Sequence, residues 1–192
     1  GFVTGANTGL GYYASAQMLS LGLSHLILAV RNLSKGEAAR KNLLSALPTS
    51  AKPPPMVEVW ELDLADYKSI VSFVERLKQS NLTIDFAILN AGVVDFKYTV
   101  NPTTSQENSI QINWLSNALL TLLLLPALDR QAKVDPNRPR PVISIVGSEV
   151  AAWAKFKEAK ISAKSGVSLL EALDHRKNFD MTDRYSTSKL LQ

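Results

Sequence analysis

The sequence predicts an α/β domain built on a parallel β-sheet with helices on both faces. Segments typical of strands alternate with segments of helical periodicity, a pattern expected when parallel strands are joined by right-handed crossovers. The run Leu26–Val30 is continuously apolar, as in a strand that is buried on both faces. A cluster of glycines joins the first strand to the first helix. Together these observations favour a single doubly wound domain over residues 1–192.

The composition fits one globular domain and argues against several kinds of site. With 192 residues, of which 46% are hydrophobic and 20% charged, the chain can form one substantial core. Cysteine is absent, so disulfides and cysteine-based metal sites are excluded, and a reducing, cytoplasmic environment is expected. His25 and His175 are too few for a zinc or iron site, so no metal is expected. The net charge is +4, but basic and acidic residues are interleaved, so we expect no nucleic-acid partner.

The most apolar stretch is expected to form a buried helix. Leu115–Leu128 has 14 residues and contains Pro126, whereas crossing a bilayer takes about 20 apolar residues. We therefore expect no membrane segment in the sequence given. The chain begins with Gly1 inside what resembles the end of a strand, so an N-terminal targeting or anchor segment ahead of it is left open.

Periodicity and turn residues predict the order of the elements. Ser34 and Glu37 have the spacing of a capping box at the start of the second helix, and Gly22 stands where a helix C-terminal glycine belongs. Four prolines within 48–55 indicate a surface loop, although Pro53–Pro55 would also suit an SH3-like partner. We expect strands over Phe2–Thr4, Leu26–Val30, Met56–Glu61, Phe86–Leu89 and Val142–Val146, and helices over 11–21, 34–47, 68–79 and 106–125.

The glycine cluster is a candidate phosphate-binding loop. The first strand leads into Thr4-Gly5-Ala6-Asn7-Thr8-Gly9-Leu10-Gly11, and a helix follows at once. Glycines there let the backbone turn tightly and approach a pyrophosphate, which then meets free N–H groups at the helix N-terminus. Glycine clusters are common in tight turns, but a strand before and a helix after are typical of a Rossmann dinucleotide loop. We therefore expect cofactor contacts from Gly5, Asn7, Thr8, Gly9, Leu10 and Gly11.

The end of the second strand predicts which nicotinamide cofactor is bound. An NAD-binding domain usually has an acidic residue about 20 positions beyond the glycines, which hydrogen-bonds the ribose 2′-OH. Arg31 stands at that distance here, and no acid follows until Glu37. A guanidinium pairs well with a 2′-phosphate, so the sequence favours NADP or NADPH. The alternative is that Arg31 is an ordinary solvated residue after a strand.

Tyr185 and Lys189 form a Y-x-x-x-K motif, which places the phenol and the ammonium on one face of a helix. A tyrosine with an ordinary pKa of about 10 exchanges protons poorly near neutral pH, and a nearby ammonium favours its phenolate. The same motif also occurs by chance on surface helices. Ser148, directly after the last predicted strand, adds a hydroxyl at the sheet edge where such folds bind ligands.

These motifs and their order resemble the short-chain dehydrogenase/reductase family over essentially the whole chain. The glycine spacing T-G-x-x-x-G-x-G is the family's variant of the dinucleotide loop. Asn90, Ala91 and Gly92 match its N-A-G motif at the end of the fourth strand. Asp63 matches the residue that contacts the adenine, and Asn113 matches the fourth catalytic residue.

The resemblance implies reversible, NADP-dependent reduction of a ketone or aldehyde to an alcohol. Tyr185 would be the general acid/base, and Lys189 would bind the nicotinamide ribose and lower the tyrosine pKa. Ser148 would orient and polarise the carbonyl, and Asn113 would support a water-based proton relay. Hydride would move directly between the nicotinamide and the substrate carbon, in the direction of reduction if NADPH is used.

The spacing of Ser148 and Tyr185, 37 residues apart, is wider than in most members of the family. The insert, from about 149 to 184, resembles that of fungal secondary-metabolism reductases, retinol-dehydrogenase-like members and monomeric carbonyl reductases. We expect it to form a lid or wall of an apolar pocket through Trp153 and Phe156, or else a solvated surface excursion. Such an insert favours a monomer. A short helix near Leu169–His175 is expected within it, with Ser168 and Glu171 as a capping box.

The chain ends at Gln192, three residues after Lys189, so the sequence predicts a Rossmann-type sheet truncated at both ends. The strand Val142–Val146 would then be an open apolar edge and an aggregation hazard. Two interpretations stay open: part of an active reductase acting on an apolar secondary metabolite, or a catalytically silent nucleotide-binding or partner-binding module. The choice among polyketide, terpenoid, retinoid and aromatic ketones is also open.

Overall fold

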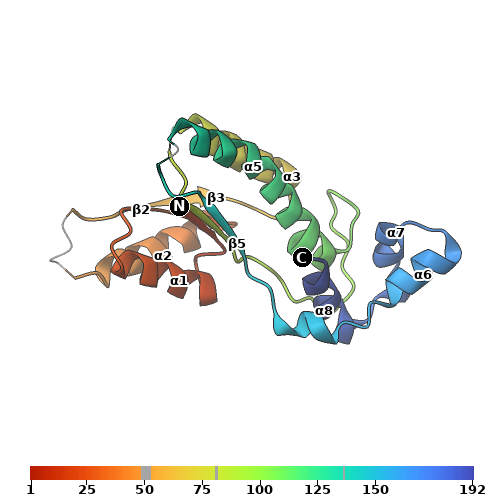
Figure 1. Ribbon diagram of the computed structural model, residues 1–192. Helices are drawn as coiled ribbons and strands as arrows, with labels where there is room; N and C mark the ends of the chain where they lie inside the picture. Colours follow the sequence, from red (N-terminus) through yellow and green to blue (C-terminus); the bar gives the residue numbers. More distant parts are fainter. Residues whose placement is uncertain (49–52, 81, 136) are drawn as a thin grey trace. The chain divides into compact units, whose positions relative to one another are not determined.

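The computed structural model describes residues 1–48, 53–80, 82–135 and 137–192 (Figure 1). Its internal contacts divide the chain into two compact units. The first, here the sheet unit, comprises Gly1–Ala91 and Leu120–Val146. The second, here the helical unit, comprises Gly92–Leu119 and Gly147–Gln192.

The sheet unit contains a five-stranded parallel sheet with the order β3-β2-β1-β4-β5. Every strand lies within one residue of its predicted bounds, and the predicted α/β fold class is confirmed. The strand order reverses between β1 and β4, and ligands of open α/β sheets bind beyond the carboxyl ends of the strands at such a reversal. The strands are β1 (Phe2–Thr4), β2 (His25–Val30), β3 (Met56–Glu61), β4 (Phe86–Leu89) and β5 (Val142–Ile145).

Helices cover both faces of this sheet (Figure 1). On one face lie α1 (Gly9–Ser20) and α2 (Leu33–Ser45), and on the other lie α3 (Tyr67–Gln79) and the Leu120–Val134 part of α5 (Ser116–Val134). Because side chains alternate along a strand, both faces of the central strands are apolar. The core on the α1 and α2 side includes Val3, Leu19, Leu26, Leu28, Val30, Ala39 and Leu43.

The opposite face of the sheet is packed with aromatic side chains. Phe73 of α3 contacts Phe2 edge to face, with ring centroids 5.2 Å apart, and contacts Trp60 at 5.8 Å. At one edge of the sheet, β5 leaves Val142 and Ile145 exposed by 55% and 42%. The open apolar edge expected from the sequence is therefore present among the described strands.

The start of α2 differs from the prediction. The helix begins at Leu33, because the side-chain oxygen of Asn32 accepts a hydrogen bond from the backbone N–H of Lys35 at 2.9 Å. Asn32 thus satisfies one of the free N–H groups of the first turn before Ser34 is reached. The prediction that Ser34 and Glu37 form a capping box is wrong.

The C-terminal end of α1 has the predicted glycine. Gly22 has φ +92°, and the N–H of Leu23 donates to the carbonyl of Met18 at 3.1 Å, as in a Schellman ending. The proline-rich loop predicted for 48–55 falls partly outside the described residues, because 49–52 are not among them.

The helix predicted for 106–125 is longer and less regular than expected. It consists of α4 (Asn108–Ile110), a π-helical turn η1 (Gln111–Leu115) and α5, which continues to Val134. The predicted bound at 125 is therefore too early, and Pro126 lies inside the helix. Proline lacks an N–H, so the carbonyl of Leu122 loses its helical partner, but Leu122 is 65% exposed and water can hydrate that carbonyl.

This helical run also passes a simple test for a membrane span. Asn108–Gln131, 24 residues with a mean hydropathy of 1.4, is long and apolar enough to cross a bilayer. In its most apolar window, 44% of the residues are buried within the protein. Buried core helices pass the same test, so one such helix among the described residues is weak support for a span.

The helical unit contains α6 (Lys157–Ser165), α7 (Leu169–Asp174) and α8 (Met181–Leu191), with short 3-10 turns η2 (Glu149–Trp153) and η3 (Arg176–Asn178). The turn η2 packs against α8, and α6 packs against α7. The short helix predicted near 169–175 is α7. Its cap is the predicted one, because Ser168 Oγ accepts a hydrogen bond from the N–H of Glu171 at 3.1 Å.

Candidate functional site

The ends of β1 and β4 are joined at the point where the strand order reverses. Thr4 Oγ1 accepts hydrogen bonds from the backbone N–H groups of Asn90, at 3.0 Å, and Ala91, at 2.9 Å. Asn90 Nδ2 donates in return to the carbonyl of Thr4 at 3.0 Å. Sequence reasoning identified Asn90 and Ala91 but not Thr4. The signal available was a hydroxyl at the end of an otherwise apolar strand.

The glycine loop has the shape that a bound diphosphate requires. A Cβ on Gly11 would lie 2.6 Å from Asn90 Nδ2 and 2.7 Å from the carbonyl oxygen of Gly5, so no side chain fits there. Gly9, at φ +56°, opens α1 toward free space. Among the described residues, Thr8 makes no side-chain cap on this helix, so the first N–H groups of α1 remain for an external acceptor. These residues therefore fit the phosphates of a dinucleotide.

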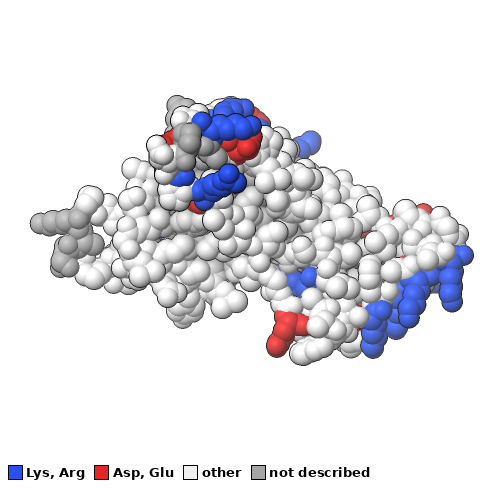
Figure 2. Space-filling model, in the orientation of Figure 1, with Lys and Arg blue, Asp and Glu red and all other residues white. Residues whose placement is uncertain are grey.

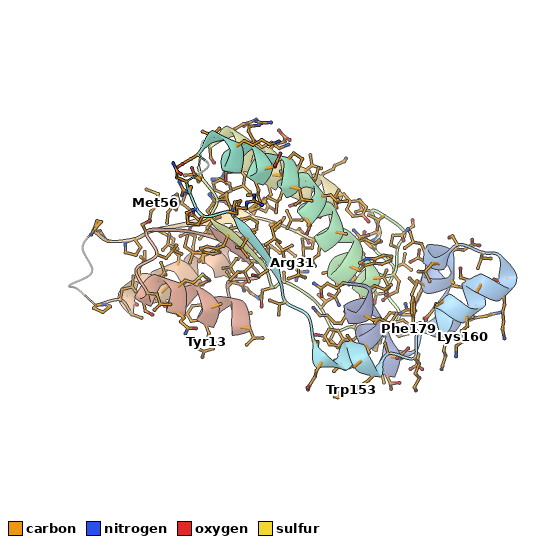
Figure 3. All side chains as sticks on the ribbon, in the orientation of Figure 1. Tyr13, Arg31, Met56, Trp153, Lys160 and Phe179 are labelled. Atoms are coloured by element: carbon orange, nitrogen blue, oxygen red, sulfur yellow. The ribbon has the colours of Figure 1, made fainter. Side chains whose placement is uncertain are left out.

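Two basic residues follow β2, the strand that pairs with β1. Arg31, labelled in Figure 3, is exposed directly after β2. Lys35, in the first turn of α2, lines a shallow cavity together with Asn7, Thr8 and Gly9. The sequence pointed to Arg31 and missed Lys35. Recognising Asn32 as the cap of α2 would have placed Lys35 in the turn that faces the loop.

Asp63 occupies the position predicted for it, directly after β3. Its Oδ1 accepts a hydrogen bond from the N–H of Ala65 at 2.9 Å, and its own N–H donates to Ser69 Oγ at 2.9 Å. The carboxylate is therefore held by the local backbone and is partly exposed.

In the helical unit, α8 holds Tyr185 and Lys189 one turn apart, as the motif predicts. Lys189 Nζ lies 5.9 Å from the centroid of the Tyr185 ring and donates to Gln192 Oε1 at 2.7 Å. Lys189 is 7% exposed, and burial lowers the pKa of its ammonium. Tyr185 is partly exposed, so a cation and a phenol lie side by side where a ligand can reach the phenol.

Asn113 and Gly92 lie next to this pair. Asn113 Nδ2 donates to Ser188 Oγ and to the carbonyl of Val93, both at 2.9 Å, and its Oδ1 accepts from the N–H of Val93 at 2.8 Å. A Cβ on Gly92 would lie 3.1 Å from Asn113 Oδ1 and 3.8 Å from Lys189 Nζ. A side chain at Gly92 would therefore press on Asn113 Oδ1, whereas its contact with the ammonium would be an ordinary one.

Asn117, for which the sequence suggested no role, supports the π-helical turn. Its Nδ2 donates to the carbonyl oxygens of Ile112, at 3.1 Å, and Asn113, at 3.0 Å. A π-turn breaks the regular hydrogen-bond ladder, and a side-chain donor helps to satisfy the carbonyls involved. The available signal was a second asparagine in an apolar helix, four residues after Asn113.

Ser148 immediately precedes η2, the turn that packs against α8. The candidate residues thus fall into two groups, each within one unit. The helical unit holds Ser148, Tyr185, Lys189, Asn113 and Gly92, and the sheet unit holds Gly5, Asn7, Thr8, Gly9, Leu10, Gly11, Arg31, Asp63, Asn90 and Ala91.

Beside Tyr185 lies a buried ion cluster that sequence reasoning missed. Arg184, 1% exposed, places Nη2 2.9 Å from Glu158 Oε1 and Nε 3.7 Å from Glu107 Oε2. Its guanidinium also lies 5.5 Å from the ring centroid of Phe179, which Figure 3 labels. Burial raises the pKa of Glu107, although hydrogen bonds from backbone N–H groups, including that of Ile110, and the charge of Arg184 oppose the rise.

The parallel sheet, the glycine loop at its reversal and the tyrosine–lysine pair define a Rossmann-type protein of the oxidoreductase class. Residues 2–136 match the family model described as short chain dehydrogenase. The chain belongs to the short-chain dehydrogenase family, whose members bind a nicotinamide cofactor.

Curated fungal relatives match nearly all of the chain. It is 42% identical over 191 residues to short-chain dehydrogenase fogG of Aspergillus ruber. The match covers 98% of this chain and 51% of that protein. It is also 42% identical over 192 residues to short chain dehydrogenase opdN of Penicillium oxalicum, covering 98% and 58%. The chain thus spans about half the length of the curated relatives it matches.

Solved structures with the same fold are more distant in sequence. The menthone neomenthol reductase of Mentha piperita superimposes with a TM-score of 0.65 at 20% identity, over 99% of this chain and 79% of that one. A metagenomic short-chain oxidoreductase in complex with NADP superimposes with a TM-score of 0.67 at 21% identity, over 99% and 69%. At this identity the likeness supports the fold.

Proposed function

We propose that this chain binds NADP and interconverts a ketone or aldehyde with an alcohol. The proposal rests above all on the Lys189 ammonium, which lies 5.9 Å from the centroid of the Tyr185 ring and beside the bare backbone of Gly92. A phenol next to a buried cation is a proton donor whose conjugate base is stabilised. That arrangement suits protonation of a carbonyl oxygen during reduction.

Each residue of the helical unit has a separate task in this mechanism. A bound nicotinamide supplies the hydride for the carbonyl carbon when the reaction runs as a reduction. Tyr185 gives its phenolic proton to the carbonyl oxygen, and Lys189 stabilises the phenolate that remains. Ser148 donates a hydrogen bond to the same oxygen and fixes its direction.

The proposed role of Asn113 in proton transfer belongs to its backbone carbonyl and not to its side chain. Its side-chain amide is engaged with Val93 and Ser188, so it anchors the π-turn and α8 to each other. Its carbonyl oxygen, which accepts a hydrogen bond from Asn117 Nδ2, is the proposed acceptor for a water of a relay toward Lys189 and Tyr185.

Arg31 and Lys35 support the choice of NADP over NAD. Lys35 lines a cavity with Asn7, Thr8 and Gly9 of the glycine loop, and Arg31, the first residue after β2, is basic where NAD-binding domains have an acid. A guanidinium can hold a 2′-phosphate through two parallel hydrogen bonds, and an ammonium adds charge. Asp63, after β3, is the proposed contact for the adenine.

An apolar ketone is the proposed substrate. Trp153 ends η2, the turn that begins right after Ser148, and it is 66% exposed (Figure 3). An exposed indole so close in sequence to the proposed carbonyl-binding residue offers a hydrophobic wall. The names of two structural neighbours refer to menthone and to ketones bulky on both sides, and those descriptions apply to those proteins.

Fluorescence titration of the purified chain with NADPH and with NADH tests the proposal, followed by turnover with a panel of ketones. We expect selective NADPH binding, and loss of turnover with retained binding in Tyr185→Phe. Binding with no turnover by the unaltered chain would instead support a silent nucleotide-binding module. Absence of binding to either cofactor would overturn the proposal.

A further inference from the structure

The inserted segment leaves the site at one proposed catalytic residue and returns at another. Ser148 directly precedes η2. Tyr185 follows Asp183 and Arg184, two buried residues near the start of α8. In the proposed function both hydroxyls reach one carbonyl oxygen. Their separation therefore has to be kept constant although 36 residues lie between them. Asp183, near the end of the insert, contacts the backbone of residues near its start.

Asp183 closes the insert near its base. Its Oδ1 accepts a hydrogen bond from the N–H of Lys155 at 2.8 Å, and its Oδ2 accepts one from the N–H of Phe156 at 3.3 Å. Oδ2 also accepts from Thr187 Oγ1 at 3.2 Å. The carboxylate is 5% exposed, so its acceptor sites are used by the insert and by α8 itself.

The backbone at this contact is strained. Phe156 has φ +44° and ψ 52°, the left-handed region that a bulky side chain rarely adopts. A strained residue persists when surrounding contacts hold it, and the carboxylate of Asp183 is bonded to the N–H of this residue. Phe156 directly precedes α6, so the strained turn sets the direction in which the insert departs.

A second tie lies one residue further along α8. Arg184 pairs with Glu158, which is in the first turn of α6 and 3% exposed. The lysines of α6, Lys157, Lys160 and Lys164, are exposed, and Lys157 Nζ lies 3.4 Å from Oδ2 of Asp180, the N-cap residue of α8. Figure 2 shows Lys and Arg side chains gathered over this part of the surface, near the position of Lys160 in Figure 3. Glu158 thus makes a buried contact with α8, whereas the lysines of α6 lie at the surface.

We propose that Asp183 is a positioning residue that fixes Ser148 relative to Tyr185 by clamping the backbone of Lys155 and Phe156, with Arg184 and Glu158 as the second tie. The clamp makes the geometry of the two hydroxyls independent of the rest of the insert. The inference rests on the proposed function for its kinetic consequence. The restraint that Asp183 places on residues 148–153 can be tested without measuring turnover.

The test compares Asp183→Ala and Asp183→Asn with a matched control, Asn101→Ala. Asn101 is buried in the same unit, and its Oδ1 accepts two backbone N–H groups, those of Thr103 at 2.9 Å and Thr104 at 3.2 Å. Its Oδ1 therefore makes the same kind of contact with backbone N–H groups as Asp183, but with Thr103 and Thr104, which lie outside the insert and outside α8. Loss of stability alone should affect both alanine variants alike.

We expect Asp183→Ala to lower kcat for a ketone by about 10²-fold, the size of effect that a misplaced catalytic group produces. The Kd for NADPH should change less than about twofold. Asp183→Asn keeps one acceptor oxygen and should recover most of the rate. Asn101→Ala should lower the melting temperature and leave kcat unchanged. A wild-type kcat in folded Asp183→Ala would overturn the proposal.

Amide hydrogen exchange gives a readout that needs no activity. In Asp183→Ala, exchange should rise at 155–156 and also at 148–153, whereas Asn101→Ala should leave 148–153 protected as in the unaltered chain. Unchanged protection of 148–153 in Asp183→Ala would overturn the proposal. If the unaltered chain binds NADPH but turns nothing over, the proposed function fails, and the exchange result still decides the role of Asp183.

Discussion

Asn113 and Ser188 are joined by a 2.9 Å hydrogen bond between Nδ2 and Oγ, which links the π-helical turn to the helix of Tyr185 and Lys189. Ser188 Oγ donates onward to the carbonyl of Tyr185 at 2.7 Å. The π-turn and the proposed catalytic helix are thus connected through two buried polar side chains, and each of them can be removed separately.

Asn113→Ala should destabilise the protein more than Ser188→Ala. Asn113→Ala removes the two hydrogen bonds to the part-buried backbone of Val93 as well as the one to Ser188, at about 0.5–1.5 kcal/mol for each bond. Ser188→Ala keeps both bonds to Val93, so we expect a loss of about 1 kcal/mol. Urea unfolding measures both variants. Equal losses would mean that Val93 finds other partners.

Gly11→Ala should weaken NADPH binding strongly. The added Cβ would stand 2.7 Å from the carbonyl oxygen of Gly5 and 2.6 Å from Asn90 Nδ2, so the loop has to shift. Because the proposed phosphate contacts are backbone N–H groups of that loop, we expect at least about a tenfold rise in Kd, or 1.4 kcal/mol. Gly147→Ala is the control, since a Cβ there meets nothing within 4 Å. Tight binding by Gly11→Ala would show that the cofactor does not use this turn.

Arg31→Asp should reverse the preference between the two cofactors. Removing the guanidinium takes away a charge-assisted contact to a 2′-phosphate, about 1.5–3 kcal/mol, and the new carboxylate repels that group. The Kd for NADPH should rise by about 10²-fold while the Kd for NADH stays the same or falls. Lys35→Met should have a smaller effect in the same direction. Titration of both variants with both cofactors checks this, and a parallel weakening for NADH would instead indicate general loop damage.

The strands and the motif positions could be predicted from the sequence because their signals are local. A strand buried on both faces must be apolar without interruption, as in Leu26–Val30, and the structure matches that expectation to within a residue. The glycine loop is equally local, since strand, glycines and helix follow one another. The family was predictable for the same reason and is confirmed.

What the sequence did not reveal depends on partners far apart in the chain or on competition between caps. Arg184 and Glu158 are 26 residues apart, and the residues around each of them do not predict that its charged side chain is buried. Asn32 and Ser34 are both acceptable caps, and the geometry after β2 selects Asn32. The helix continues past Pro126 because the carbonyl that proline frees is on the exposed side, which composition does not reveal.

Trp153→Ala should raise KM for a bulky apolar ketone and leave KM for a small ketone nearly unchanged. The indole is 66% exposed at the end of η2, so its removal should cost little stability. If it contacts substrate, losing that apolar area should raise KM by about 10-fold, or 1.4 kcal/mol, for the bulky ketone only. Steady-state kinetics with the two ketones gives the comparison. Identical KM values for both would mean that Trp153 belongs to a solvated surface.

Glu107→Gln should change how stability depends on pH. Burial raises the pKa of Glu107 above its ordinary value of 4.5, so between that value and the raised one the folded state keeps a proton that the unfolded state has lost. The contribution of this carboxyl to the free energy of unfolding is therefore largest below pH 4.5, and it falls as pH rises through the folded-state pKa. Glutamine cannot titrate, so the variant lacks this fall.

The measurement is the free energy of unfolding in urea for Glu107→Gln and the unaltered chain at a series of pH values from acid to neutral. The attraction between ionised Glu107 and Arg184 lowers this pKa, and burial outweighs it, so the expected direction already includes that ion pair. The slope is the diagnostic quantity: the difference, variant minus unaltered, should become more positive as pH rises. Glu171→Gln, at an exposed position on α7, is the control and should run parallel to the unaltered chain. Parallel curves for Glu107→Gln would mean that this carboxyl titrates alike in both states, and that the Arg184 cluster is hydrated in solution.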